Sequence, residues 1–293
     1  MKFSLPAHKP FNFLSVVKSH GWYQLAPFYL DEEANRLHYV LQLANGRVIE
    51  LRMQDGGDSV LVETEKLDKL ERKEVADKVN WMLGLDLDFA HFYRASRGEP
   101  KLAHVRKRSL GRVLRSPTVF EDVVKTILTT NTLWGATKNM TRKLVDQFGP
   151  LLDEQPEKRA FPSPASIAAS SPEVLKETVR VGYRAPALHQ LAFRVASGQI
   201  DLESLKTSTL PTLELRKFLM TINGVGPYAA ANLLMILGRH DFIPIDSYAL
   251  KMVSQEWYEG QPITAKEVEQ RFAHWGEFKG LAFWFWDWKY NGG

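Results

Sequence analysis

Cysteine is absent from the 293-residue sequence. Its absence excludes disulfide bonds, thiolate metal sites, a cysteine nucleophile and an iron–sulfur cluster. The eight histidines include no pair at the i, i+4 spacing that places two metal ligands on one helix face, so we expect no zinc site. Catalysis by this chain must therefore come from oxygen or nitrogen groups.

Long apolar runs are also missing. No stretch reaches the roughly 20 apolar residues needed to cross a bilayer, and the first ten residues contain no apolar core of a signal peptide. We therefore expect a protein without membrane contacts, located in the cytoplasm or nucleoid. We also expect a monomer.

The charge balance permits binding to nucleic acid without proving it. The formal net charge is +4, from 38 Lys plus Arg against 34 Asp plus Glu, and the pI is about 9.1. A basic stretch runs from His104 to Arg108 and is followed by Arg112 and Arg115. Taken alone, this stretch is interpreted as a solvated loop.

The pattern of apolar residues predicts an α+β protein. Short runs rich in aromatic and β-branched residues between 21 and 62 predict antiparallel strands, with the hairpin turn at Asn45-Gly46. Beyond Glu65 the spacing becomes helical. Residues 118–148 predict two helices with a break at residues 129–131, and the prolines at 156, 162 and 164 predict a surface loop. We place an N-terminal strand-rich domain at 1–95 and a mainly helical domain at 96–293, with the active site in a cleft between two helical subdomains.

A pair of glycines interrupts the helical segment LRKFLMTINGVGPYAAANLLMIL. Gly224 and Gly226 mark a tight turn between two helices, and Pro227 suits the first turn of the second helix. Backbone N–H groups in such a turn, at a helix N-terminus, form a cradle for a phosphate oxygen. An ordinary helical hairpin would show the same glycines.

A carboxylate follows one helix and one short loop later. Asp246, in the run FIPIDSYAL, stands where it would cap a new helix, which is the commonest reason for an Asp at such a position. A capping role is compatible with catalysis, because backbone N–H donors favour the charged carboxylate.

These motifs together resemble the helix-hairpin-helix (HhH-GPD) DNA glycosylases, whose signature is the hairpin, a Gly/Pro-rich loop and a catalytic aspartate. Further likeness lies in GRVLRSPTVFEDVVKTIL, FPSPASIA, VGYRAPALHQLA and HWGEFKGLAFWFW, so it covers about residues 111–286. The strand-rich N-terminus fits the 3-methyladenine DNA glycosylase II and 8-oxoguanine branches. The resemblance implies double-stranded DNA with a damaged base as partner and Asp246 as the catalytic group.

The resemblance also assigns roles to the hairpin and the helix break. Gly224, Val225, Gly226 and Tyr228 would contact the DNA backbone, and Asn131 would fill the gap left by a flipped base. Family members that cleave the DNA strand carry a lysine where this chain has Tyr228, and a phenol cannot form a Schiff base. We therefore expect a monofunctional enzyme without AP-lyase activity. No cofactor is expected, and whether a monovalent cation sits at the hairpin is left open.

The aromatic C-terminus bears on the damaged base. Where the 8-oxoguanine branch has a glutamine, this chain has Phe283, which offers no hydrogen bond. We expect a base pocket from Tyr228, Tyr248, Trp275 and Phe283, with most other C-terminal aromatics in the core. Such a pocket suits cationic alkylated purines. An oxidised or deaminated base on the same scaffold, or a non-catalytic DNA-damage binding protein, are the alternatives. Tyr183 and Arg184 are interpreted as packing residues.

Overall fold

The computed structural model describes residues 1–153 and 155–286 and divides into two compact units. Unit 1 comprises Met1–Asp88 and Arg112–Thr207, and unit 2 comprises Phe89–Gly111 and Ser208–Gly293. The units are interleaved along the chain. A single division of the chain after residue 95, expected from the sequence, stays a prediction.

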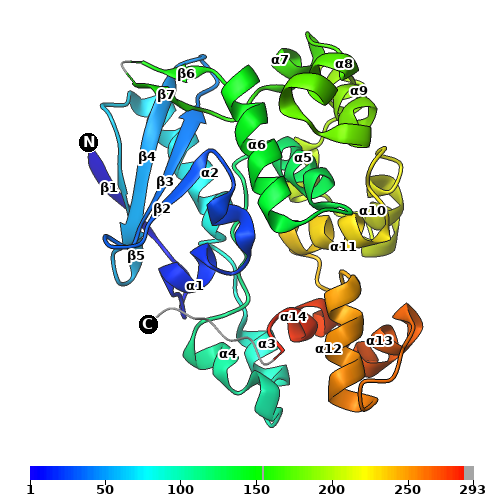
Figure 1. Cartoon of the computed structure of the whole chain (residues 1–293). Helices are drawn as coiled ribbons and strands as arrows, with labels where there is room; N and C mark the ends of the chain where they lie inside the picture. Colours follow the sequence, from blue (N-terminus) through cyan, green and yellow to red (C-terminus); the bar gives the residue numbers. More distant parts are fainter. Residues whose placement is uncertain (154, 287–293) are drawn as a thin grey trace. The chain divides into compact units, whose positions relative to one another are not determined.

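Unit 1 contains a five-stranded antiparallel sheet in the order β1-β5-β4-β3-β2 (Figure 1). Its strands are β1 (Lys2–Pro6), β2 (Phe28–Asp31), β3 (Arg36–Gln42), β4 (Val48–Asp55) and β5 (Ser59–Glu63). Gly46, with φ of +89°, closes the β3–β4 turn, so the predicted hairpin at Asn45-Gly46 is confirmed. The first strand was not predicted, because β1 is defined by pairing with β5 some 60 residues away.

Helices complete unit 1. They are α1 (Phe13–Val17), η1 (Gly21–Gln24), α2 (Lys69–Leu83), α5 (Val119–Thr129), α6 (Trp134–Phe148), α7 (Pro164–Ala168), α8 (Pro172–Val174), η3 (Leu175–Val179), η4 (Gly182–Arg184), α9 (Ala185–Ala196) and η5 (Glu203–Thr207). The predicted break between α5 and α6 is confirmed. Asp68 begins α2 with a capping box to Glu71, which satisfies the first free amides of the helix.

The prediction of a proline-rich surface loop in this part of unit 1 is wrong in part. Two short strands, β6 (Leu151–Leu152) and β7 (Gln155–Arg159), pair there. Lys158 at the end of this hairpin contacts Glu50 of β4 at 2.9 Å, and Leu152 and Ala160 pack with Val40. These long-range contacts with the main sheet stabilise a conformation that local proline content does not indicate.

Unit 2 is entirely helical in its described part (Figure 1). Its elements are α3 (Ala90–Ala95), η2 (Pro100–Leu102), α4 (His104–Lys107), α10 (Thr212–Leu219), α11 (Pro227–Ile236), α12 (Ser247–Trp257), α13 (Ala265–Phe272), η6 (Ala273–Phe278) and α14 (Lys279–Trp284). Over the described residues, no helix combines the length and the apolar character that a membrane span requires.

The basic stretch does not form the single solvated loop that was predicted. His104–Lys107 is the helix α4, and Arg106, Lys107 and Arg108 are exposed. Arg112 and Arg115 are instead buried in unit 1. Arg112 donates to the carbonyls of His8, Pro10, Gly84 and Leu87, and Arg115 stacks on Trp81 at 4.3 Å. A buried guanidinium whose donors are satisfied by carbonyls holds several loops together.

Candidate active site

The glycine pair forms a turn between α10 and α11 in unit 2, as predicted. Ile222 donates its N–H to Leu219 at 3.1 Å, and Val225 donates to Ile222 at 3.0 Å. Gly224 has φ of +87°, a conformation that side chains with a Cβ rarely adopt. The Val225 side chain is buried and its amide is already bonded, so Val225 anchors the turn rather than presenting a donor.

Two amides of the turn are available to a ligand. The N–H groups of Gly224 and Gly226 make no hydrogen bond with the residues that the structure describes. Gly226 is the N-cap of α11, and a Cβ at this position would meet nothing within 4 Å. Because these donors lie at the N-terminus of a ten-residue helix, the local field favours an anion.

Asp246 lies at the start of the next helix. Its Oδ1 accepts the N–H of Ala249 at 2.9 Å, so the predicted capping role is confirmed. The preceding Ile243 and Pro244 are buried and fix the loop, whereas the Asp246 side chain is exposed. Its second carboxylate oxygen has no hydrogen-bond partner among the described residues. The carboxylate is therefore oriented by the backbone and open to a ligand on one side.

Tyr228 and Asp246 interact electrostatically. Burial raises the pKa of the Tyr228 phenol above its usual value, and the negative charge of Asp246 raises this pKa further. The phenol is thus neutral at physiological pH and can act as a hydrogen-bond donor or as an apolar wall. The structure brings together the hairpin, Tyr228 and Asp246 in unit 2.

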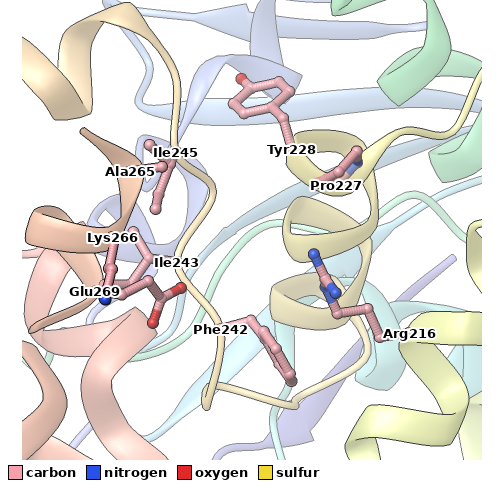
Figure 2. A pocket seen from close by; sticks show the side chains of 9 residues that line it. All are labelled: Arg216, Pro227, Tyr228, Phe242, Ile243, Ile245, Ala265, Lys266 and Glu269. Carbon is pink, nitrogen blue, oxygen red and sulfur yellow. The ribbon is translucent and has the colours of Figure 1, made fainter.

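A hollow of about 320 Å³ lies beside the hairpin. Figure 2 shows Pro227 and Tyr228 at one end and Phe242 at the other. Arg216 contributes a guanidinium that stacks on the Phe242 ring at 4.9 Å, and Lys266 also lines the hollow. One carboxylate, Glu269, also lines the hollow, but it forms an ion pair with Lys279 at 2.7 Å, so the lining keeps a positive balance that suits a cationic base poorly. Of the predicted base-pocket residues only Tyr228 lines it.

The other three predicted base-pocket residues differ in exposure. Tyr248, two residues after Asp246, is 68% exposed. Trp275 and Phe283 are each 8% exposed, and Phe283 packs edge-on against Phe272 at 5.7 Å. The expectation that the C-terminal aromatics are mostly core holds for Phe283, Phe285 and Trp275. Trp288 of this aromatic group lies outside the described residues.

Asn131 lies in unit 1, at the break between α5 and α6. Its backbone is left-handed, with φ of +47°, and its Nδ2 donates to the Tyr183 hydroxyl at 3.3 Å. Arg184 donates to the Thr130 carbonyl and stacks on the Tyr183 ring at 4.5 Å. Leu133 is 83% exposed. The break therefore presents a polar amide beside two exposed apolar groups, Leu133 and Tyr183.

The interpretation of Tyr183 as a packing residue is wrong. Its side chain is 66% exposed, whereas the neighbouring Arg184 is buried as expected. No local pattern in the sequence indicates this exposure, because Tyr183 is placed at the helix break by its contact with Asn131, 52 residues away in sequence. Within the described ranges, no group of three or more carboxylate or imidazole side chains is placed to hold a metal ion.

Comparison with known proteins places these features in a family. A family model described as the HhH-GPD superfamily base excision DNA repair protein matches residues 124–277. DNA-3-methyladenine glycosylase 2 of Escherichia coli is 28% identical over 171 residues. This match covers 57% of the chain and 57% of that relative, so the chain spans little more than half the relative's length.

Solved structures share the fold over nearly the whole chain. A 3-methyladenine DNA glycosylase from Archaeoglobus fulgidus superposes with a TM-score of 0.75 at 22% identity, covering 98% of this chain and 97% of that one. An 8-oxoguanine glycosylase/lyase from Clostridium acetobutylicum, in complex with double-stranded DNA, has a TM-score of 0.67 at 19% identity, covering 92% and 91%. Since the family model matches more than half of the residues, the chain belongs to the HhH-GPD superfamily of base excision DNA repair proteins.

Proposed function

We propose that the chain is a monofunctional DNA glycosylase that hydrolyses the N-glycosidic bond of alkylated purines in double-stranded DNA. The observation that carries this proposal is the placement of Asp246: an exposed carboxylate, oriented as the N-cap of α12, in the same unit as a hairpin with two amides that bond to no described residue. The proposal includes a monomer that acts in the cytoplasm or on the nucleoid.

Asp246 has the chemistry that glycosidic bond cleavage needs. Departure of the base leaves an oxocarbenium-like sugar, and a carboxylate stabilises this developing positive charge. The C1′–N bond breaks with its electron pair going to the base, water supplies the oxygen that bonds to C1′, and the proton of that water passes to Asp246 or to solvent. An N-alkylated purine already carries a positive charge, so it leaves without a general acid.

The remaining residues take supporting roles in the proposal. The hairpin Gly224–Gly226 binds a phosphate, with Tyr228 at the beginning of α11, and Asn131 occupies the gap in the base stack, flanked by Leu133 and Tyr183. Tyr228 and Tyr248 contact the flipped base most directly. Trp275 and Phe283 contribute little to this contact, because each side chain is only 8% exposed.

A panel of duplexes, each with one damaged base, tests the substrate. We expect release of 3-methyladenine and 7-methylguanine. Release of 8-oxoguanine without release of the alkylated purines would overturn the choice of substrate. The similarity of the fold to an 8-oxoguanine glycosylase/lyase makes this the second candidate, and the aromatic Phe283 argues against it.

Substitution of Asp246 tests the chemistry. Asp246→Asn keeps an oxygen to cap α12 but removes the charge, and we expect single-turnover excision to slow on the order of 10²-fold or more. Asp241→Asn, in the same loop, is the matched control and should excise at the wild-type rate. Full excision by Asp246→Asn would show that the catalytic group is another residue. Loss of excision with DNA binding intact would also exclude a purely DNA-binding function for the wild-type chain.

A further inference from the structure

The positive charge of the chain is concentrated in one segment of unit 2. Residues 89–111 carry six Lys and Arg against Glu99 as the one acidic residue, a net charge of +5. Since the whole chain carries +4, all other residues together carry −1. A DNA-binding protein needs positive potential where phosphates pass, and the net charge of this segment supplies such a potential.

The charges of this segment are exposed, and most have no carboxylate partner among the described residues. Arg94, Arg97, Arg106, Lys107 and Arg108 are all exposed, and none forms a salt bridge within the described ranges. Lys101 is the exception, because it contacts Glu256 of α12 at 3.2 Å. Close like charges repel one another, so a surface of this kind stabilises the fold little and favours an external anion.

The segment is held firmly in unit 2. Phe92 is fully buried and packs against Phe278 of η6 at 5.8 Å, and the Tyr93 hydroxyl donates to the Leu110 carbonyl at 2.8 Å. The Lys101–Glu256 ion pair joins it to α12, the helix that Asp246 caps. The exposed cations therefore project from the same compact unit that carries the hairpin and the carboxylate.

A hollow of about 460 Å³ lies on this surface, and Arg97 and Arg106 are on its lining. Tyr93 forms part of its wall, and Glu99 also lines it, with its carboxylate accepting the N–H of Lys101 at 3.0 Å. Two guanidiniums at one concave site match the geometry of phosphate oxygens, which Arg binds with two parallel hydrogen bonds.

We propose that residues 89–111 form a second DNA-binding surface, which contacts phosphates of the duplex in addition to the phosphate bound at the hairpin. The proposal rests on the proposed function for the presence of duplex DNA. This surface increases the affinity for duplex DNA. It binds undamaged as well as damaged duplex, because contacts with phosphates carry no information about the base.

Salt dependence of binding to a short undamaged duplex tests this surface. Arg106→Gln/Lys107→Gln/Arg108→Gln removes three exposed cations, and Lys66→Gln/Lys69→Gln/Lys73→Gln removes three exposed cations of unit 1 as the matched control. We expect the first variant to bind about tenfold more weakly or worse near 0.1 M salt. Its slope of log K against log [salt] should fall in magnitude by about 0.9 for each phosphate that is no longer neutralised, while the control keeps the wild-type slope.

Further measurements separate the possible outcomes. A second variant, Arg94→Gln/Arg97→Gln, should also lower the slope, and thermal unfolding should match the wild type in all variants. A wild-type slope in both unit 2 variants, or an equal loss in the control, would overturn the proposal. The proposal would also be overturned if the unit 2 variants bound DNA as the wild type does but excised the base more slowly in a single turnover at saturating enzyme. If the wild type excises no base, the proposed function fails, yet the slopes still decide whether this surface binds DNA.

Discussion

At the scale of single residues, the proposal that water rather than an amine attacks the sugar depends on Tyr228. Its phenol lies close enough to Asp246 for the carboxylate charge to raise its pKa, and it cannot form an imine. We therefore expect no covalent adduct between the wild-type protein and DNA when borohydride is added during excision. Denaturing gel electrophoresis of labelled DNA measures the adduct.

The variant Tyr228→Lys is the control for this experiment. It places an amine beside Asp246, and we expect an adduct to appear on borohydride treatment, which shows that the assay detects an imine. Efficient trapping of the wild-type chain would contradict the prediction and would indicate that another amine, such as Lys217 or Lys251, attacks the sugar.

At the scale of elements, the two glycines of the hairpin allow the proposed DNA binding to be tested separately from folding. Gly226 has φ of −88° and open space where a Cβ would stand, whereas Gly224 has φ of +87°. We expect Gly226→Ala to cost under about 1 kcal/mol in the free energy of unfolding and to weaken DNA binding, because a methyl group stands beside the free amides. Urea unfolding and fluorescence anisotropy measure the two effects.

Gly224→Ala provides the contrast. A Cβ in the left-handed region costs about 1–2 kcal/mol, so this variant should lose stability as well as affinity. Wild-type affinity in Gly226→Ala would indicate that phosphate does not approach this turn.

At the scale of the whole molecule, a buried polar cluster in unit 1 couples stability to pH. The Tyr39 hydroxyl donates to Glu121 at 2.6 Å, joining the sheet to α5, and Lys125 contacts the same carboxylate at 2.6 Å. Asp122 accepts hydrogen bonds from the Trp22 indole and the Ser116 N–H. Burial nevertheless raises the pKa of Asp122 from 3.8 to about 7.

This shift fixes the sign of the pH dependence. A raised pKa means that the folded state binds the proton more tightly, so the stabilisation from Asp122 is complete below pH 4 and is lost as the pH rises through about 7. The wild type should therefore lose a few kcal/mol relative to Asp122→Asn between about pH 4 and 7. The asparagine keeps an oxygen for Trp22 and Ser116. Urea unfolding of both proteins across this range measures the difference.

His20 has the opposite effect on the pH dependence of stability of each protein, but this effect cancels when wild type and Asp122→Asn are compared. Burial lowers the pKa of His20 to about 4, so its contribution to stability increases from pH 4 to 6.5. Because His20 is present in both proteins, the difference between wild type and Asp122→Asn isolates the carboxyl group. A difference that does not change with pH would contradict the assignment.

Local patterns in the sequence account for most of the elements that carry the proposed site. Asn45-Gly46, the glycines at 224 and 226 and the capping Asp246 each act through the backbone within a few residues, so their structures follow from the sequence alone. The resemblance to the HhH-GPD family supplied the chemistry expected of that aspartate, and the family model confirms the membership.

Tertiary contacts decided the features that local sequence patterns did not predict. The pairing of β1 with β5, the burial of Arg112 and Arg115 and the contact of Tyr183 with Asn131 all join residues far apart in sequence. A guanidinium or a phenol has the same local preference in either environment, and only the neighbours that folding brings to it decide whether it is buried or exposed. The sequence by itself therefore determined the hairpin and the aspartate, whereas the fold decided which of the chain's cations remain exposed on the surface.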